Sequence, residues 1–120
     1  MKRRVLIADD NHDAAETLAL VLRLEGHDVT VVNNGREALA SCQALMPEVA
    51  ILDIGMPELD GCEVARQIRQ GSLGRAVTLI ALTGFGQETD KARALAAGFN
   101  HHFTKPVEPD RLSDLLASEG

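Results

Sequence analysis

The chain has 120 residues, of which 45% are hydrophobic and 25% charged, as expected for one soluble globular domain over residues 1–120. No apolar run approaches the roughly 20 residues that a membrane-spanning helix needs. The net charge of −6, with one basic cluster at Lys2, Arg3 and Arg4, argues against direct binding to nucleic acid. We therefore expect a cytoplasmic protein with no membrane segment in this chain.

Short apolar runs alternate with helical patterns along the whole chain. Strands are predicted at 5–8, 27–32, 49–53, 77–82 and 101–104. Helices are predicted after Asn11 as far as Gly26, and at about 36–45, 62–69, 88–97 and 110–117. Because each crossover is long enough to hold a helix, the alternation predicts a doubly wound α/β domain, with a five-stranded parallel sheet and helices on both faces.

The helical patterns also predict which side chains face the core. In the first helix the inward stripe is Ala14, Leu18, Val21 and Leu22, and in the fourth helix it is Ala92, Leu95 and Ala96. Leu20 and Leu24 lie beyond the first stripe, and packing against a neighbouring helix explains them better than a docking surface does. Cys42 and Cys62 are far apart within predicted helices, which favours buried or half-buried free thiols.

Polar side chains gather where the predicted strands end. Asp9 and Asp10 follow the first strand, Asp53 ends the third, Thr83 ends the fourth, and Lys105 follows the fifth. If all strands are parallel, these groups share one rim of the sheet, where ligands and chemistry collect in open α/β folds. Each residue alone also has a structural interpretation, as a helix cap, a strand-end hydroxyl or a solvated lysine, but together they indicate a site.

Three carboxylates at one rim indicate a cation. Oxygen ligands from aspartates suit Mg²⁺, with Mn²⁺ as a substitute, better than Zn²⁺. A cation there would make Asp53 usable as a nucleophile toward phosphorus, while Lys105 neutralises one phosphoryl oxygen and Thr83 hydrogen-bonds another. The pattern predicts phosphoryl transfer to Asp53.

These motifs resemble those of the response-regulator receiver domains of two-component signalling, along essentially the whole chain. The matching segments are Leu6 to Asn11, Leu52 to Pro57 with Asp60-Gly61, Ala81-Leu82-Thr83, and Thr104-Lys105-Pro106. The resemblance implies the flavodoxin-like strand order 2-1-3-4-5.

The resemblance also implies roles for single residues. Asp53 would accept the phosphoryl group from the phosphohistidine of a histidine kinase or a histidine phosphotransfer domain, and Asp9, Asp10, Asp53 and the Gly55 carbonyl would hold Mg²⁺. Thr83 and Lys105 would bind phosphoryl oxygens, and the Lys105–Pro106 peptide bond would be cis. Such a domain is a signalling phosphoacceptor and not an enzyme, beyond catalysing its own phosphorylation and slow dephosphorylation. Phosphorylation would switch the face formed by the fourth helix, fifth strand and fifth helix.

The chain departs from the family pattern at three positions. His102 stands where receivers often carry Tyr or Phe, so a switching role and a purely structural one both remain open for it. Gly55 and Phe85 lie at positions that influence the lifetime of the phosphoryl group, and neither offers a polar side chain to activate water. Slow self-dephosphorylation is therefore expected.

Two other functions fit parts of the pattern. A phosphatase or phosphotransferase of the haloacid-dehalogenase type also uses an aspartate nucleophile with Mg²⁺, but its second acid would fall at Gly55. A degenerate receiver that only binds a partner is disfavoured by the intact Asp9, Asp10, Thr83 and Lys105. The chain is expected to be a free-standing receiver or a piece of a hybrid histidine kinase or of a longer regulator, and segments 84–87 and 102–107 most resemble the receivers of hybrid kinases. The sequence leaves the output partner open.

Overall fold

A computed structural model describes residues 2–56, 58–71, 77–84 and 88–118, and their side chains except those of 88–90 and 118. Within these residues five strands form one parallel sheet in the order β2-β1-β3-β4-β5. This confirms the predicted fold class and strand order.

Strands and helices alternate strictly along the described chain. The strands are β1 (Arg4–Ala8), β2 (Asp28–Val32), β3 (Val49–Asp53), β4 (Thr78–Thr83) and β5 (His101–Thr104). The helices are α1 (His12–Leu24), α2 (Gly35–Leu45), α3 (Gly61–Gln70), α4 (Glu88–Ala97) and α5 (Pro109–Ser118).

Polar caps begin the first three helices at the rim where the strands end. Asn11 accepts a hydrogen bond from the Ala14 N–H, and Asn34 accepts one from the Glu37 N–H. Asp60 does the same for Glu63 at the start of α3. Because these caps satisfy N–H groups that have no intrahelical partner, they fix where each helix leaves the strand-end loops.

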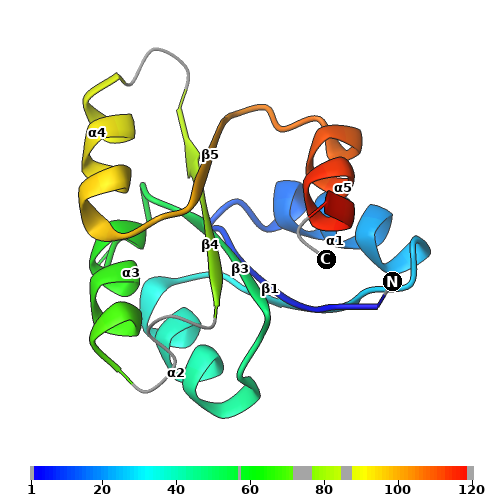
Figure 1. The fold of residues 1–120 in the computed structure, drawn as a ribbon, viewed down its shortest axis with the longest axis horizontal. Helices are drawn as coiled ribbons and strands as arrows, with labels where there is room; N and C mark the ends of the chain where they lie inside the picture. Colours follow the sequence, from blue (N-terminus) through cyan, green and yellow to red (C-terminus); the bar gives the residue numbers. More distant parts are fainter. Residues whose placement is uncertain (1, 57, 72–76, 85–87, 119–120) are drawn as a thin grey trace.

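The sheet separates two hydrophobic layers. Figure 1 shows α1 and α5 on one side of it and α2, α3 and α4 on the other. Side chains alternate between the two layers along each strand: Val5 and Ile7 of β1 pack toward α1 and α5, whereas Leu6 and Ala8 pack on the opposite side. Since every residue of β3 is buried, this strand forms the centre of the molecule.

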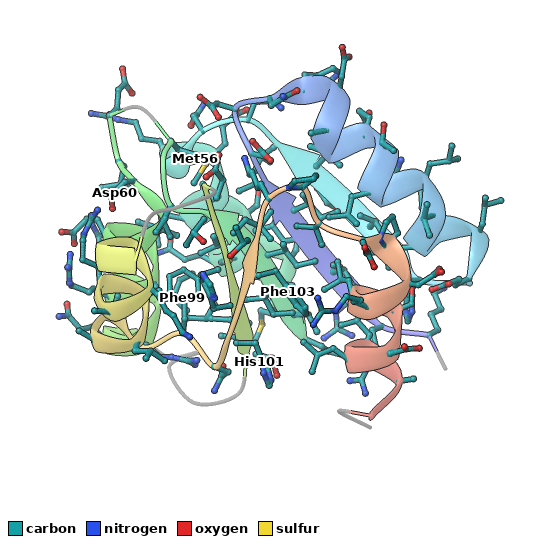
Figure 2. All side chains as sticks on the ribbon, turned by 90° about the horizontal axis from the view of Figure 1, so that it is seen from above. Met56, Asp60, Phe99, His101 and Phe103 are labelled. Carbon is teal, nitrogen blue, oxygen red and sulfur yellow. The ribbon has the colours of Figure 1, made fainter. Side chains whose placement is uncertain are left out.

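The two phenylalanines near β5 illustrate this division. Phe99 belongs to the layer under α2, α3 and α4, and Phe103 packs against the layer under α1 and α5. Figure 2 shows the Phe99 and Phe103 rings on opposite sides of β5, the orange strand.

The structure corrects the predicted inward face of α1. Leu18 and Leu22 are buried as expected, but Ala15 and Ala19 join them in place of Ala14 and Val21. Small side chains that face the sheet let the helix axis lie close to it, a preference that a ranking by hydrophobicity alone misses.

The exposed leucines are a further difference from the predicted packing. In α4, Ala94 and Ala97 face the core, and Leu95 is 60% exposed. Leu20 and Leu24 are 57% and 79% exposed, so the prediction that they pack against a neighbouring helix is wrong.

Both cysteines are buried thiols outside any disulfide among the described residues, as predicted. Burial raises the pKa of the Cys42 thiol to about 11, which keeps it protonated at neutral pH. Among the described helices, none is long and apolar enough to cross a membrane.

Candidate functional site

Strand register brings two of the predicted acids together. Ala8 of β1 pairs with Leu52 of β3, so the residues that follow, Asp9 and Asp53, leave adjacent strands side by side. Both are buried, at 2% and 7% exposure, whereas Asp10 is exposed. One carboxylate oxygen from each of these three residues lies within 4.8 Å of the others. The predicted acidic cluster is therefore present.

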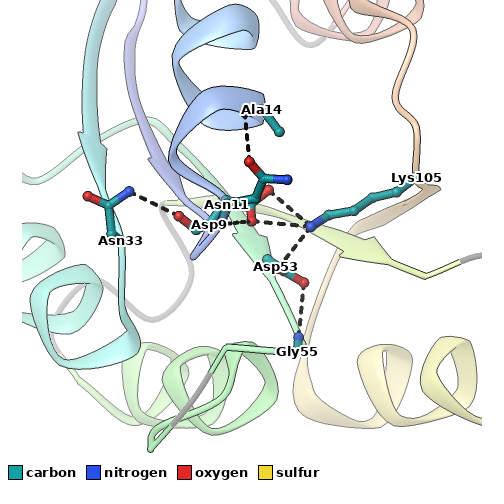
Figure 3. Close-up of polar contacts among 7 residues, drawn as sticks. All are labelled: Asp9, Asn11, Ala14, Asn33, Asp53, Gly55 and Lys105. Atoms are coloured by element: carbon teal, nitrogen blue, oxygen red, sulfur yellow. Dashed lines mark hydrogen bonds and ion pairs between the residues drawn. The ribbon is translucent and has the colours of Figure 1, made fainter.

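The Lys105 ammonium joins this cluster from the loop after β5, as Figure 3 shows. Its Nζ lies 2.9 Å from Asp53 Oδ2 and 3.0 Å from Asp9 Oδ2. The backbone N–H of Lys105 donates to the Thr83 carbonyl at 2.7 Å, and the Lys105–Pro106 peptide bond is cis. The end of β4 and the turn after β5 thus position the lysine over both carboxylates.

Backbone groups orient the two buried carboxylates. The Gly55 N–H donates to Asp53 Oδ1 at 3.0 Å, and the Asn11 N–H donates to Asp9 Oδ1 at 2.9 Å (Figure 3). The Asn33 side chain donates to the Asp9 carbonyl at 3.1 Å. The sequence indicated Asn11 only as a helix cap and Asn33 only as a turn residue. Cap and turn patterns do not specify the contacts that these two residues make with Asp9.

The electrostatic environment differs between the two buried acids. Burial raises the pKa of Asp9 above its usual 3.8, and the hydrogen bonds from Asn11 and Lys105 only partly oppose this. Burial also acts on Asp53, but hydrogen bonds from Gly55 and Lys105 outweigh it, and its pKa is lowered. The pKa of Lys105 is raised despite burial, because the ammonium bonds to both carboxylates. The site keeps Asp53 ionised and available as a nucleophile.

Thr83 lies at the end of β4, next to the strand that carries Asp53. It is 1% exposed, and its Oγ1 lies 2.6 Å from Nε2 of the half-buried His102 in β5. The structure thus brings His102 into direct contact with the predicted phosphoryl-binding hydroxyl, a contact that the sequence left open. Phe85 lies outside the described residues.

The acidic cluster has the chemistry of a magnesium site. Three carboxylates against one ammonium leave a formal charge of −2. Carboxylate oxygens are hard ligands, and the exposed Asp10 gives the cluster an open side for water, which Mg²⁺ usually retains. The residues present therefore fit a divalent cation.

An open cleft of about 630 Å³ lies beside the cluster. Its lining includes Asp9 and Lys105, together with Asp13 and Thr17 of α1 and with Pro106.

Comparisons with known proteins identify the family of this chain. Residues 5–117 match the response regulator receiver domain. The solved receiver domain of sensor histidine kinase PA1611 from Pseudomonas aeruginosa PAO1, with magnesium coordinated in its active site cleft, is 30% identical. It superimposes with a TM-score of 0.89, covering 98% of this chain and 97% of that one.

Two curated relatives agree with this result. An uncharacterised 14.6 kDa protein of Leptolyngbya boryana is 38% identical over 93% of this chain and 86% of its own length. The DNA-binding response regulator MtrA of Mycolicibacterium paratuberculosis is 34% identical over 93% of this chain but only 48% of its own. The chain thus spans about half the length of MtrA.

The chain belongs to the response regulator receiver domain family. It is a phosphoacceptor-type domain of two-component signalling with a flavodoxin-like fold.

Proposed function

We propose that Asp53 accepts a phosphoryl group from the phosphohistidine of a histidine kinase or a histidine phosphotransfer domain. The supporting observation is the arrangement at the strand ends. The ionised, buried Asp53 carboxylate lies 2.9 Å from the Lys105 ammonium, inside a cluster of three acids. In the transfer a phosphorus–oxygen bond to Asp53 forms while the phosphorus–nitrogen bond to the histidine breaks.

The residues around Asp53 supply the groups that this transfer needs. Gly55 holds one carboxylate oxygen through its N–H, so the side chain has a fixed orientation. Lys105 already contacts the other oxygen and is placed to neutralise charge on an incoming phosphoryl group.

Asp9, Asp10, Asp53 and the Gly55 carbonyl would hold Mg²⁺, or Mn²⁺ in its place. A bound divalent cation would offset the negative charge that a phosphoryl group brings to this rim. The solved PA1611 receiver has magnesium in its active site cleft, which supports this part of the proposal.

The proposal describes a signalling domain and not an enzyme, acting in the cytoplasm. Phosphorylation of Asp53 would change the face formed by α4, β5 and α5, because Thr83 and His102 connect the site to that edge of the sheet. The relative MtrA is named as DNA-binding, so a DNA-binding output elsewhere in a longer protein is one candidate.

Intact mass after incubation with acetyl phosphate tests the proposal. The wild type should gain one phosphoryl group with Mg²⁺ and none with chelator, and Asp53→Asn should gain none. Asp28→Asn, an exposed acid at the start of β2 and so at the opposite end of the sheet, is the matched control and should load like the wild type.

Equal uptake by Asp53→Asn would contradict the proposal. Continuous release of phosphate with no trapped adduct would instead favour the hydrolase alternative.

A further inference from the structure

The buried Thr83 and the half-buried His102 form a hydrogen-bonded pair between β4 and β5. Their side chains come from adjacent strands, where Ala81 pairs with His102 and Thr83 with Thr104. Thr83 Oγ1 and His102 Nε2 are 2.6 Å apart, a short distance for a neutral pair. In the described part of the structure, this imidazole nitrogen is the hydrogen-bond partner of the Thr83 hydroxyl.

The direction of this hydrogen bond depends on where the imidazole carries its proton. If Nε2 is unprotonated, it accepts the hydroxyl hydrogen of Thr83; if Nε2 is protonated, it donates to Oγ1. In the second case the hydroxyl hydrogen would need another acceptor, and leaving it without one in a buried position is costly. The structure without a phosphoryl group therefore favours Thr83 donating to Nε2.

A phosphoryl group on Asp53 would reverse this preference. Its oxygens are strong acceptors, so the Thr83 hydroxyl would donate to one of them. Two lone pairs, on Oγ1 and on an unprotonated Nε2, would then face each other across 2.6 Å. A proton on Nε2 removes this repulsion and restores the hydrogen bond.

We propose that His102 is a positioning residue for the Thr83 hydroxyl, changing from hydrogen-bond acceptor to donor when Asp53 is phosphorylated. The inference rests on the proposed function. The ring keeps its charge, because Nδ1 gives a proton to water while Nε2 takes one from water. The side chain thus acts through its tautomer and needs no rotation.

His102 is half-buried in β5, the last strand of the sheet. His102 helps to line a depression of about 250 Å³ between β5 and α5, together with Thr104 and the charged residues Glu108 and Arg111. His102 links a buried hydroxyl to the face proposed to bind the output partner.

Loading rates from acetyl phosphate with Mg²⁺ test the coupling. His102→Phe keeps a ring and removes both nitrogens, and it should slow loading about fivefold, the effect of one net hydrogen bond. Thr83→Val should slow loading at least as much. The double variant should load no more slowly than Thr83→Val alone, because each substitution removes the same hydrogen bond between Thr83 and His102. His102→Gln has an amide that can accept or donate a hydrogen bond, so it should load faster than His102→Phe and close to the wild-type rate.

A nearby substitution and a spectroscopic measurement separate positioning from simple packing. His101→Phe, at the adjacent position of β5, should load at the wild-type rate. Nitrogen-15 shifts of the His102 ring should show an unprotonated Nε2 in the free protein and a protonated Nε2 after loading with beryllofluoride, a phosphoryl mimic.

The inference is overturned if the tautomer is the same in both states, or if the two single effects multiply in the double variant. If the wild type loads at Asp53 and His102→Phe loads equally fast, the inference fails and the proposed function stands. A wild type that does not load at all would overturn both.

Discussion

Both oxygens of the Asp53 carboxylate are held before any phosphoryl group arrives. Oδ1 accepts from the Gly55 N–H, and Oδ2 contacts the Lys105 ammonium. These contacts keep the pKa of Asp53 low although the side chain is buried. At Asp9 the hydrogen bonds do not offset the effect of burial, so the pKa of this carboxyl is raised. The different pKa shifts of the two neighbouring acids fit their proposed roles, Asp53 as the nucleophile and Asp9 as a cation ligand.

Asp9→Asn should stabilise the protein in the absence of Mg²⁺. The raised pKa of Asp9 means that its ionised form is disfavoured in the folded state, so its contribution to stability is fully present below pH 3.8 and is lost as pH rises through the folded pKa. Asparagine removes the charge and can still accept the Asn11 N–H, so it should increase the free energy of unfolding at pH 7 by about 1 kcal/mol.

Urea unfolding at pH 7 and at pH 3 checks this prediction, since the gain should shrink at the lower pH, where Asp9 is itself neutral. The variant should also lose any stabilisation that Mg²⁺ gives to the wild type. Reduced stability at pH 7 would show that the ion pair with Lys105 outweighs the cost of burial.

At the scale of elements, the loop after β3 is packed directly against the start of α3. A Cβ atom on Gly61 would lie 2.7 Å from the Asp53 carbonyl oxygen and 2.8 Å from the Ile54 Cα, both backbone atoms with little freedom to move. The helix that Asp60 caps therefore supports the segment that carries Asp53, the proposed phosphoacceptor.

Gly61→Ala should lower stability by about 2 kcal/mol, a typical cost of overpacking, and should slow loading of Asp53 by displacing it. Gly71→Ala, at the other end of α3, is the matched control because its Cβ would meet neighbours at 3.6 Å, an ordinary contact. Thermal unfolding and intact mass measure the two effects. Equal behaviour of both variants would contradict the proposed close packing.

Arg69 of α3 connects three elements at the end of the sheet opposite the acidic cluster. Its guanidinium donates to the carbonyls of Gly98 and Val77 at 2.9 Å each and to Asn100 Oδ1 at 2.7 Å. Asn100 Oδ1 also accepts from the Leu79 N–H at 2.8 Å. This network joins the end of α3, the start of β4 and the turn between α4 and β5.

Arg69→Met should destabilise the fold by about 2 kcal/mol, because it keeps the aliphatic stem but leaves several acceptors unsatisfied. Arg66→Met, on the same helix, removes an exposed pair with Glu63, the one ion pair of Arg66 among the described residues, and should change stability by less than about 0.5 kcal/mol. Chemical unfolding of the two variants compares them directly. A small effect at Arg69 would mean that water replaces its hydrogen bonds.

At the scale of the whole molecule, the sequence was sufficient to predict the parallel sheet and the residues that share its rim. The alternation of strands with helices implies parallel pairing of the strands. Parallel pairing places Asp9, Asp53, Thr83 and Lys105 at the same rim of the sheet. The inward faces of α1 and α4 were not predicted correctly, because alanine and leucine are both apolar and only three-dimensional packing decides which faces the sheet.

The contact between Thr83 and His102 could not be predicted either. It depends on the side-chain conformation of one residue in an edge strand, and no spacing pattern encodes that. The same holds for Asn11 and Asn33, whose contacts with Asp9 arise only when the loops after β1 and β2 meet.

The most direct test of the account is to locate the phosphoryl group within the chain. After loading with acetyl phosphate and Mg²⁺, borohydride reduction converts an aspartyl phosphate to homoserine, which peptide mass spectrometry identifies by position. The account predicts homoserine at position 53 and nowhere else, with loss of the signal when Mg²⁺ is chelated. Homoserine at Asp9 or Asp10, or a loaded protein with none at position 53, would contradict it.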